Sequence, residues 1–351
     1  MSAWVERELR RAKEDIMNTQ DTELQNAFQD IEDISDLPRS EWLGCVRSLG
    51  DELGYFQSLG DQFSAVFLDE KPRLLVSFDT FERSTERTDK GYPLGMELAS
   101  QQGWSSLTLL AHSSDDNANW FRSKKIYRYF DRLVDEGFFE DFDQVVFYGA
   151  GACGYAAAAY SVVAPGATVI TIAPQATLES RLASWDRRFP KTRRMDFTSR
   201  YGFAPDMIDG AEQAYVFYDP RIEADAMHAA LFHKPHVTNV PCRLFGSDPE
   251  YEMIEMKALA PILEAAMLGT LTPRVITRAL RNRHFNGGYQ RRLLSELAAG
   301  ARPYQTALLC RHVLRQRKHA PRFRKAYEQA VATLDEKGIP LAAPLNKMEQ
   351  A

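Results

Sequence analysis

The sequence predicts an α/β protein with a mostly parallel, doubly wound sheet and a C-terminal helical extension. Short apolar, β-branched runs, such as residues 145–148 and 168–172, alternate with segments of helical spacing. Strands of a parallel sheet are buried on both faces, which explains why these runs lack polar alternation. From Tyr251 onward the strand signal stops while helical spacing continues, so we expect the extension to follow the sheet.

Length and composition bound the number of domains. The chain has 351 residues, of which 44% are hydrophobic, enough for one large domain with additions or for two domains. We divide it into an acidic N-terminal arm (1–37), a sheet domain (38–270) and a basic helical extension (271–351). The arm carries 10 acidic and 4 basic residues and ends at Leu37-Pro38. We expect it to be mobile or bound to a partner.

The individual elements follow from apolar runs and turn residues. Two strands, 63–69 and 73–78, flank Glu70-Lys71-Pro72 and suggest a hairpin. Further strands are expected at 106–111, 145–148, 168–172, 214–218 and 237–245. Helices are expected at 120–136, 152–163, 254–268, 273–282, 289–299, 303–316 and 322–335. Hinges are expected at 286–288 and 300–303.

The glycine-rich turn after residue 148 fits two functional templates. Gly149, Gly151 and Gly154 match the G-x-G-x-x-G loop that binds dinucleotides. The same turn aligns with the nucleophile elbow of an α/β-hydrolase, G-x-S-x-G, but Gly151 stands at the serine position and Cys153 at the last glycine, so the usual nucleophile is missing. A strand, a tight turn and a helix would in either case present backbone N–H groups at the sheet edge.

Chain order favours the hydrolase elbow over the dinucleotide loop. A dinucleotide loop follows the first strand of its domain, and an acid ends the next strand to hold the ribose. Here several strands precede the loop, and residues 168–172 run into Ala173-Pro174-Gln175 without an acid. Asp219 lies where the acid of a hydrolase triad is expected. The loop after Phe245, where the histidine should lie, has Ser247 and Asp248 instead.

The stretches 147–158, 173–178, 218–221 and 225–232 resemble those of a family of α-proteobacterial proteins of the Rhodobacter and Roseobacter type. These proteins are often labelled phosphoadenosine phosphosulfate reductase, and the resemblance covers roughly residues 38–315. It implies an α/β-hydrolase-like fold with an elbow related to YGxSMGGYAA. The label implies sulfonucleotide reduction, but the C-terminal Glu-Cys-Gly-x-His-type segment of true reductases is absent, and Cys310 stands in Leu309-Cys310-Arg311-His312.

Three residues are candidates for catalysis. Cys153 lies near the N-terminus of the elbow helix, where a thiolate is favoured, but it is two residues past the apex, and we favour a small buried core residue. Asp219 is the candidate acid. His228 could share a helix face with Asp225 as an acid–base pair or a weak metal site, or serve a structural role. The expected ligand-binding residues are Asp79, Thr80, Trp120, Gly149, Gly151, Ala152, Gly154 and Tyr155.

These features predict a catalytically degenerate α/β-hydrolase homologue that binds a small ligand or a protein partner. The alternatives are an enzyme with a non-standard site, thiol-dependent or of the sulfonucleotide-reductase type, and a nucleotide-binding protein. We expect no metal, no cofactor, no membrane segment and a cytoplasmic location, and leave a homo-oligomer open. Residues 271–325 carry 14 Lys and Arg and one acid, Glu296. We expect this block to contact acidic protein surface rather than nucleic acid.

Overall fold

The structure is a computed structural model, and it describes residues 31–70, 72–112, 120–317 and 319–342. The chain divides into two units, which are considered separately. Unit 1 runs to Tyr251 and includes Ala260–Thr272. Unit 2 comprises Glu252–Leu259 and the described chain from Pro273 onward. Most of the expected arm lies outside the described residues.

Unit 1 is built on one eight-stranded sheet with the order β1-β2-β4-β3-β5-β6-β7-β8. The strands are β1 (Gly54–Ser58), β2 (Phe63–Leu68), β3 (Arg73–Thr80), β4 (Ser105–Ala111), β5 (Gln144–Ala150), β6 (Thr168–Ile172), β7 (Gln213–Tyr218) and β8 (Val237–Pro241). Pairing is antiparallel from β1 to β2 and from β2 to β4, and parallel between all other neighbours. This arrangement, with a sharp turn after β5, is that of the α/β-hydrolase fold.

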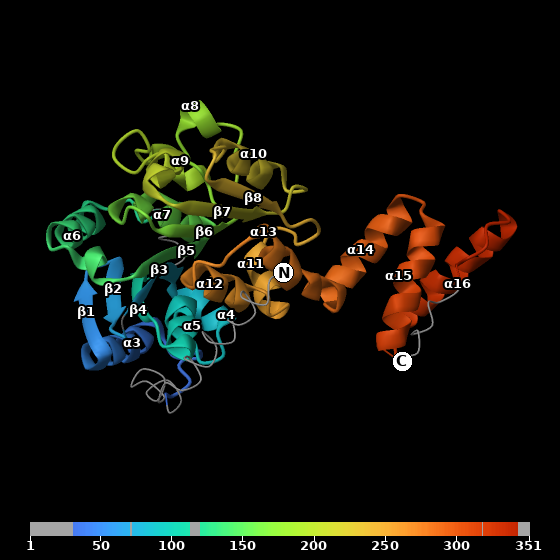
Figure 1. The fold of residues 1–351 in the computed structure, drawn as a ribbon, viewed down its shortest axis with the longest axis horizontal. Helices are drawn as coiled ribbons and strands as arrows, with labels where there is room; N and C mark the ends of the chain where they lie inside the picture. Colours follow the sequence, from blue (N-terminus) through green and yellow to red (C-terminus); the bar gives the residue numbers. More distant parts are fainter. Residues whose placement is uncertain (1–30, 71, 113–119, 318, 343–351) are drawn as a thin grey trace, which may run out of the picture. The chain divides into compact units, whose positions relative to one another are not determined.

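Helices cover both faces of the sheet (Figure 1). One face packs against α6 (Lys124–Asp135), α7 (Ala152–Tyr160), α9 (Ala204–Met207) and α10 (Glu223–Leu231). The other face packs against α3 (Arg39–Leu53) and α5 (Leu94–Gln102). Strand β2 shows the split: Ala65 and Phe67 belong to the core under α6 and α7, whereas Val66 and Leu68 belong to the core under α3 and α5. Alternation along a strand thus supplies two hydrophobic cores.

The predicted hairpin of residues 63–69 and 73–78 is wrong. Strand β4 lies between β2 and β3, so these sequence neighbours are not paired. The apolar pattern marked both strands correctly, but β3 runs parallel to β4 and β5, which requires a crossover. The expected helix at 120–136 begins later, at Lys124, where the side chain of Ser123 caps it by accepting a hydrogen bond from Lys125 N.

Residues 31–37, which the sequence analysis placed in the arm, lie against the sheet domain. Ile34 is buried, and its N–H donates to Lys90 O at 2.9 Å. Ile31 and Leu37 pack on the same core as α3. Residues 31–37 therefore pack with the sheet domain.

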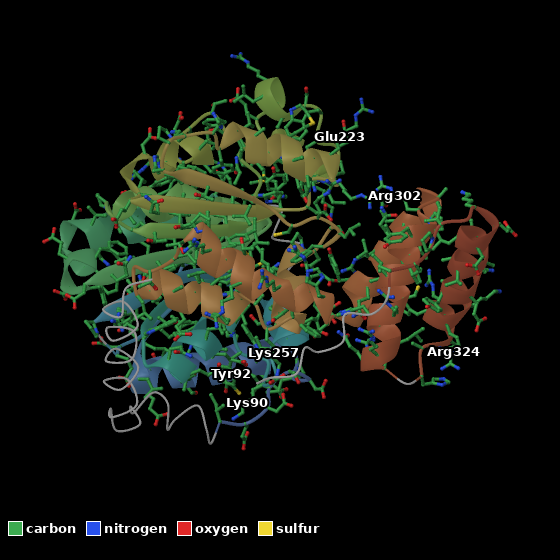
Figure 2. The ribbon with its side chains drawn as sticks, turned by 45° about the vertical axis from the view of Figure 1, so that its right-hand side comes forward. Lys90, Tyr92, Glu223, Lys257, Arg302 and Arg324 are labelled. Carbon is green, nitrogen blue, oxygen red and sulfur yellow. The ribbon has the colours of Figure 1, made fainter. Side chains whose placement is uncertain are left out.

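Helices follow the sheet: α11 (Pro249–Glu255), α12 (Leu259–Met267), α13 (Pro273–Ala279), α14 (Gly287–Ala299), α15 (Pro303–Gln316) and α16 (Pro321–Glu336). The expected single helix at 254–268 is two helices, separated at Lys257, whose φ is 52°. The expected hinge at 286–288 is a helix start, because Asn286 Oδ1 accepts from Tyr289 N at 2.8 Å. In unit 2, Arg302 and Arg324, both labelled in Figure 2, are exposed.

Candidate functional site

The turn between β5 and α7 has the geometry of a nucleophile elbow. Gly151 stands at its apex with φ 59° and ψ −124°, a conformation that favours glycine. Its N–H donates to Ile172 O at 2.8 Å, which ties the turn to the neighbouring strand β6. A Cβ at Gly151 would meet no atom within 4 Å, whereas one at Gly149 would lie 2.3 Å from the backbone oxygen of Cys153. The apex thus has room for a side chain but carries none.

Asp219 lies at the end of β7, where the triad acid is expected, but it serves the backbone. Its Oδ1 accepts from Arg221 N at 3.0 Å, and its Oδ2 accepts from Gly246 N at 2.7 Å. The carboxylate is buried and links the loops that follow β7 and β8. Neither of its partners is a histidine, so this acid orients no imidazole.

His228 on α10 is fully buried and uses both ring nitrogens. Its Nδ1 accepts from Ala176 N at 3.1 Å, so the proton is assigned to Nε2, which lies 3.0 Å from Asp186 Oδ2. Burial lowers the pKa of His228, and the hydrogen bond to Asp186 only partly opposes that effect. The ring is therefore a neutral structural link rather than a free base, and its pairing partner is Asp186 instead of Asp225.

The expected partner of His228, Asp225, belongs to an arginine clamp. Arg188 Nη1 lies 2.6 Å from Asp225 Oδ1, and its Nη2 lies 2.8 Å from Asp186 Oδ2. Burial raises the pKa of Asp225, with Arg188 acting against that rise. Asp186 and Asp225 thus hold the Arg188 guanidinium in a fixed position, and His228 supports Asp186.

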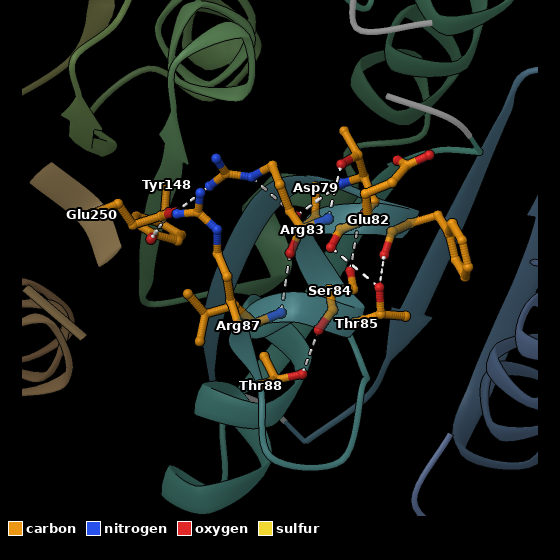
Figure 3. A network of polar contacts seen from close by, with 12 residues as sticks. Asp79, Glu82, Arg83, Ser84, Thr85, Arg87, Thr88, Tyr148 and Glu250 are labelled. Carbon is orange, nitrogen blue, oxygen red and sulfur yellow. Dashed lines mark hydrogen bonds and ion pairs between the residues drawn. The ribbon is translucent and has the colours of Figure 1, made fainter. Parts of the chain in front are cut away.

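A second polar cluster lies between α4 (Phe81–Arg87) and the start of α11 (Figure 3). Its centre is Glu250, which is buried and accepts from Tyr148 OH and from Arg83 Nη2. Arg87 also contacts Glu250, at 2.5 Å, and binds Asp248 through both terminal nitrogens, at 3.1 and 2.6 Å. The loop that should carry a triad histidine therefore carries a buried acid bound by two arginines.

Burial and charge act together on the groups of this cluster. Burial opposes the charge of Arg83, but Glu250 and the other anions beside it outweigh that effect and raise its pKa. Burial and the neighbouring Glu250 raise the pKa of Tyr148 well above its ordinary value. Burial also raises the pKa of Asp79, against the opposing effect of Arg83. The arginines stay charged, and Tyr148 stays a hydrogen-bond donor.

A cleft of about 500 Å³ opens above the elbow, and both polar clusters reach it. Trp120 and Phe189 form an apolar wall, with their rings edge to face at 4.8 Å. The charged residues that line the cleft are Arg83, Arg87, Arg188, Lys191, Asp225, Asp248 and Glu250. This volume falls in the range of small-molecule sites.

The structure brings only some of the expected ligand-binding residues to the cleft. Trp120, Gly151 and Ala152 line it. The others are not among its lining residues: Asp79, Thr80, Gly149, Gly154 and Tyr155. Asp79 accepts hydrogen bonds from Thr80 N at 2.8 Å and Leu94 N at 3.1 Å, so this carboxylate shapes the end of β3 and also occupies the Thr80 N–H.

Tyr155 is also engaged, because its hydroxyl contacts Tyr201 O and Arg122 Nη1. Among the cleft residues that the sequence analysis did not select are Arg83, Arg87, Arg188 and Glu250. One feature of the sequence could have identified two of them. Arg83 and Arg87 are spaced i, i+4 directly after a predicted strand, which places them on one face of a helix.

Cys153 is buried beneath the elbow and does not line the cleft. Burial raises the pKa of its thiol to about 12, and the nearby Arg83 offsets this only in part. Across the described residues there is no group of three or more His, Cys, Asp or Glu side chains placed to hold a metal ion. Nor does any helix in the described ranges have the length and apolar character to cross a bilayer.

No protein-family model and no curated protein matches the chain. Solved structures with a similar fold include an esterase from Pyrobaculum calidifontis, at 14% identity over 71% of this chain and 97% of that chain, with a TM-score of 0.39. A carboxyl esterase from Tuber melanosporum matches at 14% identity over 62% and 82%, with a TM-score of 0.40.

The glycosylation-associated Gap123 complex of Streptococcus agalactiae matches at 17% identity, with a TM-score of 0.38. The match covers 54% of this chain and 42% of that one, so it spans less than half of that protein's length. Likenesses this distant carry no information on activity.

Proposed function

We propose that this protein is a non-hydrolytic member of the α/β-hydrolase fold that binds a small ligand in the elbow cleft. The observation that carries the proposal is Gly151, which keeps the elbow conformation yet has no nucleophile above it. Without a nucleophile, a general base has no proton to remove. The cleft itself is retained, with a volume and a mixed apolar and charged lining that suit a small molecule.

The residues that could serve as a general base or triad acid also support a non-hydrolytic protein. Asp219 is occupied by backbone N–H groups, and His228 has both ring nitrogens engaged. Glu250, which follows β8, has its carboxylate bound by Arg83 and Arg87. Asp219, His228 and Glu250 are thus each engaged in other contacts, and they do not form a triad with one another.

The other functions considered have less support. A thiol-dependent hydrolase would need Cys153 exposed and ionised, whereas it is buried with a raised pKa. A dinucleotide site would need an acid at the end of β6, and that strand ends at Ile172 before Ala173-Pro174. Sulfonucleotide reduction would need a reactive cysteine, and Cys310 is buried, with burial raising its thiol pKa to about 11.

The test is a screen with short p-nitrophenyl esters together with a fluorophosphonate probe. We expect no turnover and no stoichiometric serine labelling, because the apex carries no hydroxyl. Gly151→Ser, which the open space accommodates, should accept the probe slowly at most and still give no ester turnover, since no histidine is among the described residues that line the cleft. Stoichiometric labelling of a serine in the unmodified protein would refute the proposal.

A further inference from the structure

The corner of the cleft beside the elbow offers a hydrogen-bond donor without a partner. Arg83 Nη2 binds Glu250, and its Nε faces Asp79 Oδ1 at 3.4 Å without forming a hydrogen bond. Within the described part of the chain, no hydrogen bond of Arg83 Nη1 is found, and the guanidinium bond to Glu250 uses Nη2. The side chain is 20% exposed, and the residue lines the cleft together with Gly151. The network in Figure 3 therefore fixes this guanidinium and leaves one nitrogen for a ligand.

Arg83 lines the same cleft as Gly151, and a Cβ at Gly151 would meet no atom within 4 Å, so the elbow does not fill this space. On the same side, the N-terminus of α7 presents N–H groups that have no carbonyl partner within the helix. The two other lining arginines already bind carboxylates: Arg87 binds Asp248 and Glu250, and Arg188 binds Asp186 and Asp225. Arg83 is thus the arginine that can reach a new acceptor without breaking an existing pair.

We propose that the cleft binds a small carboxylate that accepts a hydrogen bond from Arg83 Nη1 and places its apolar part against Trp120 and Phe189. This inference rests on the proposed function, in that it assumes a ligand in the cleft. The net charge of the residues around the cleft distinguishes between a carboxylate and a phosphate as the ligand. Four cations and three carboxylates, Asp225, Asp248 and Glu250, line the cleft, and Asp79 and Asp186 lie beside Arg83 and Arg188, so the charges of these groups nearly cancel and leave no positive excess. A monoanion fits that balance better than a dianion.

The apolar wall argues for a ligand with a flat hydrophobic group. Trp120 is held by its Nε1, which donates to Gln175 Oε1 at 3.2 Å, and Phe189 packs edge to face on it. Arg188 also lies over the Phe189 ring, 5.3 Å from its centroid, which further fixes that wall. A rigid aromatic surface in the same cleft as Arg83 Nη1 is suited to an aryl or short alkyl carboxylate.

The experiment titrates the protein with benzoate, with its neutral isostere benzamide, and with inorganic phosphate. Binding is followed by calorimetry at constant ionic strength. We expect benzoate to bind with a dissociation constant of roughly 1 mM or tighter, and benzamide and phosphate to bind at least about tenfold more weakly. Arg83→Gln should weaken benzoate at least about tenfold and remove its advantage over benzamide.

Two control variants separate this role from a general disturbance of the cluster. Tyr148→Phe removes another partner of Glu250 without touching the cleft lining, and Arg200→Gln removes a positive charge that binds Asp131 elsewhere. Both should keep benzoate affinity within about twofold. If Arg83→Gln does not fold, Arg83→Lys keeps the charge beside Glu250 but removes the second terminal nitrogen, and it should show the same loss.

Equal affinity for benzoate and benzamide, preference for phosphate, or equal losses in Arg83→Gln and the controls would each overturn the carboxylate site. Absence of benzoate binding would overturn it as well. None of these outcomes bears on the missing nucleophile, because the fluorophosphonate and ester assays report on Gly151 independently. Failure of this inference and failure of the proposed function are therefore distinguishable.

Discussion

At the scale of single residues, Cys153 shows how burial can override a favourable local field. It lies in the first turn of α7, where the helix dipole favours a thiolate. The side chain is nevertheless enclosed by the core, and burial raises its pKa to about 12. At pH 7 a thiol with that pKa is ionised in only about one molecule in 10⁵. The thiol therefore acts as a small apolar side chain.

We expect iodoacetamide to modify Cys45 well before Cys153 in the native protein between pH 7 and pH 8. Cys45 is the only one of the four cysteines that is not buried. Cys153→Ala should cost about 1 kcal/mol or less in the free energy of unfolding and should leave ligand binding unchanged. Peptide mapping of the alkylated protein shows the order in which the cysteines are modified. Preferential labelling of Cys153 would show that the elbow opens and would favour a thiol-dependent enzyme.

Sequence reasoning found residues of the right type in this region but not their partners. Asp219 stands at the expected acid position, yet its two contacts are backbone N–H groups contributed by loops. His228 was paired with Asp225 by helical spacing, whereas the fold brings Asp186, which is 42 residues away, to its Nε2. Long-range contacts of this kind depend on loop paths, and local periodicity carries no information about them.

At the scale of elements, the elbow is the part of the site that the sequence predicted best. Its strand, glycine turn and helix leave a local signature, because the close approach of β5 and α7 excludes a Cβ at Gly149. The arginine and glutamate cluster was missed for the opposite reason. Arg83 comes from α4 and Glu250 from α11, which are 167 residues apart in sequence. Only the assembled sheet brings them together.

The two glycines of the elbow should respond differently to alanine. Gly149→Ala places a Cβ 2.3 Å from the backbone oxygen of Cys153, and backbone cannot move aside cheaply, so we expect a loss of about 3 kcal/mol. Gly151→Ala meets no atom, and only its positive φ is unfavourable, so about 1–2 kcal/mol should be lost. Urea denaturation of both variants measures the difference. A larger loss at Gly151 would mean that the backbone strain, and not the packing, determines this turn.

The strands show the same division between local and non-local information. Apolar runs identified seven of the eight strands, including β6 at its observed bounds, because buried parallel strands are continuous in sequence. The pairing of β2 with β3 was wrong, since proximity in sequence suggested a hairpin and the sheet instead inserts β4. Strand β1 (Gly54–Ser58) and helix α3 were not predicted, and β1 is a five-residue strand without a fully buried position.

At the scale of the whole molecule, the charge is divided along the chain. Residues 1–270 carry a net charge of −16, and residues 271–325 carry +13. Within unit 2 several of these cations already have partners. Arg292 lies 2.6 Å from Glu252, Arg317 donates to Phe285 O, and Arg322 donates to Ser295 Oγ. The basic block is therefore partly used for holding the helices of its own unit together.

This distribution leads us to expect only weak, non-specific binding to nucleic acid. A random duplex should bind with a dissociation constant weaker than about 1 μM at 150 mM salt, and its affinity should fall steeply with salt as counterions are released. Fluorescence anisotropy with a labelled 20-base-pair duplex measures both quantities. Arg302→Glu and Arg324→Glu, at two exposed cations of unit 2, should lower the residual affinity and the salt slope together, because each removes a charge and no base contact. Submicromolar binding with a shallow salt slope would contradict this interpretation, since it would require contacts beyond phosphate neutralisation.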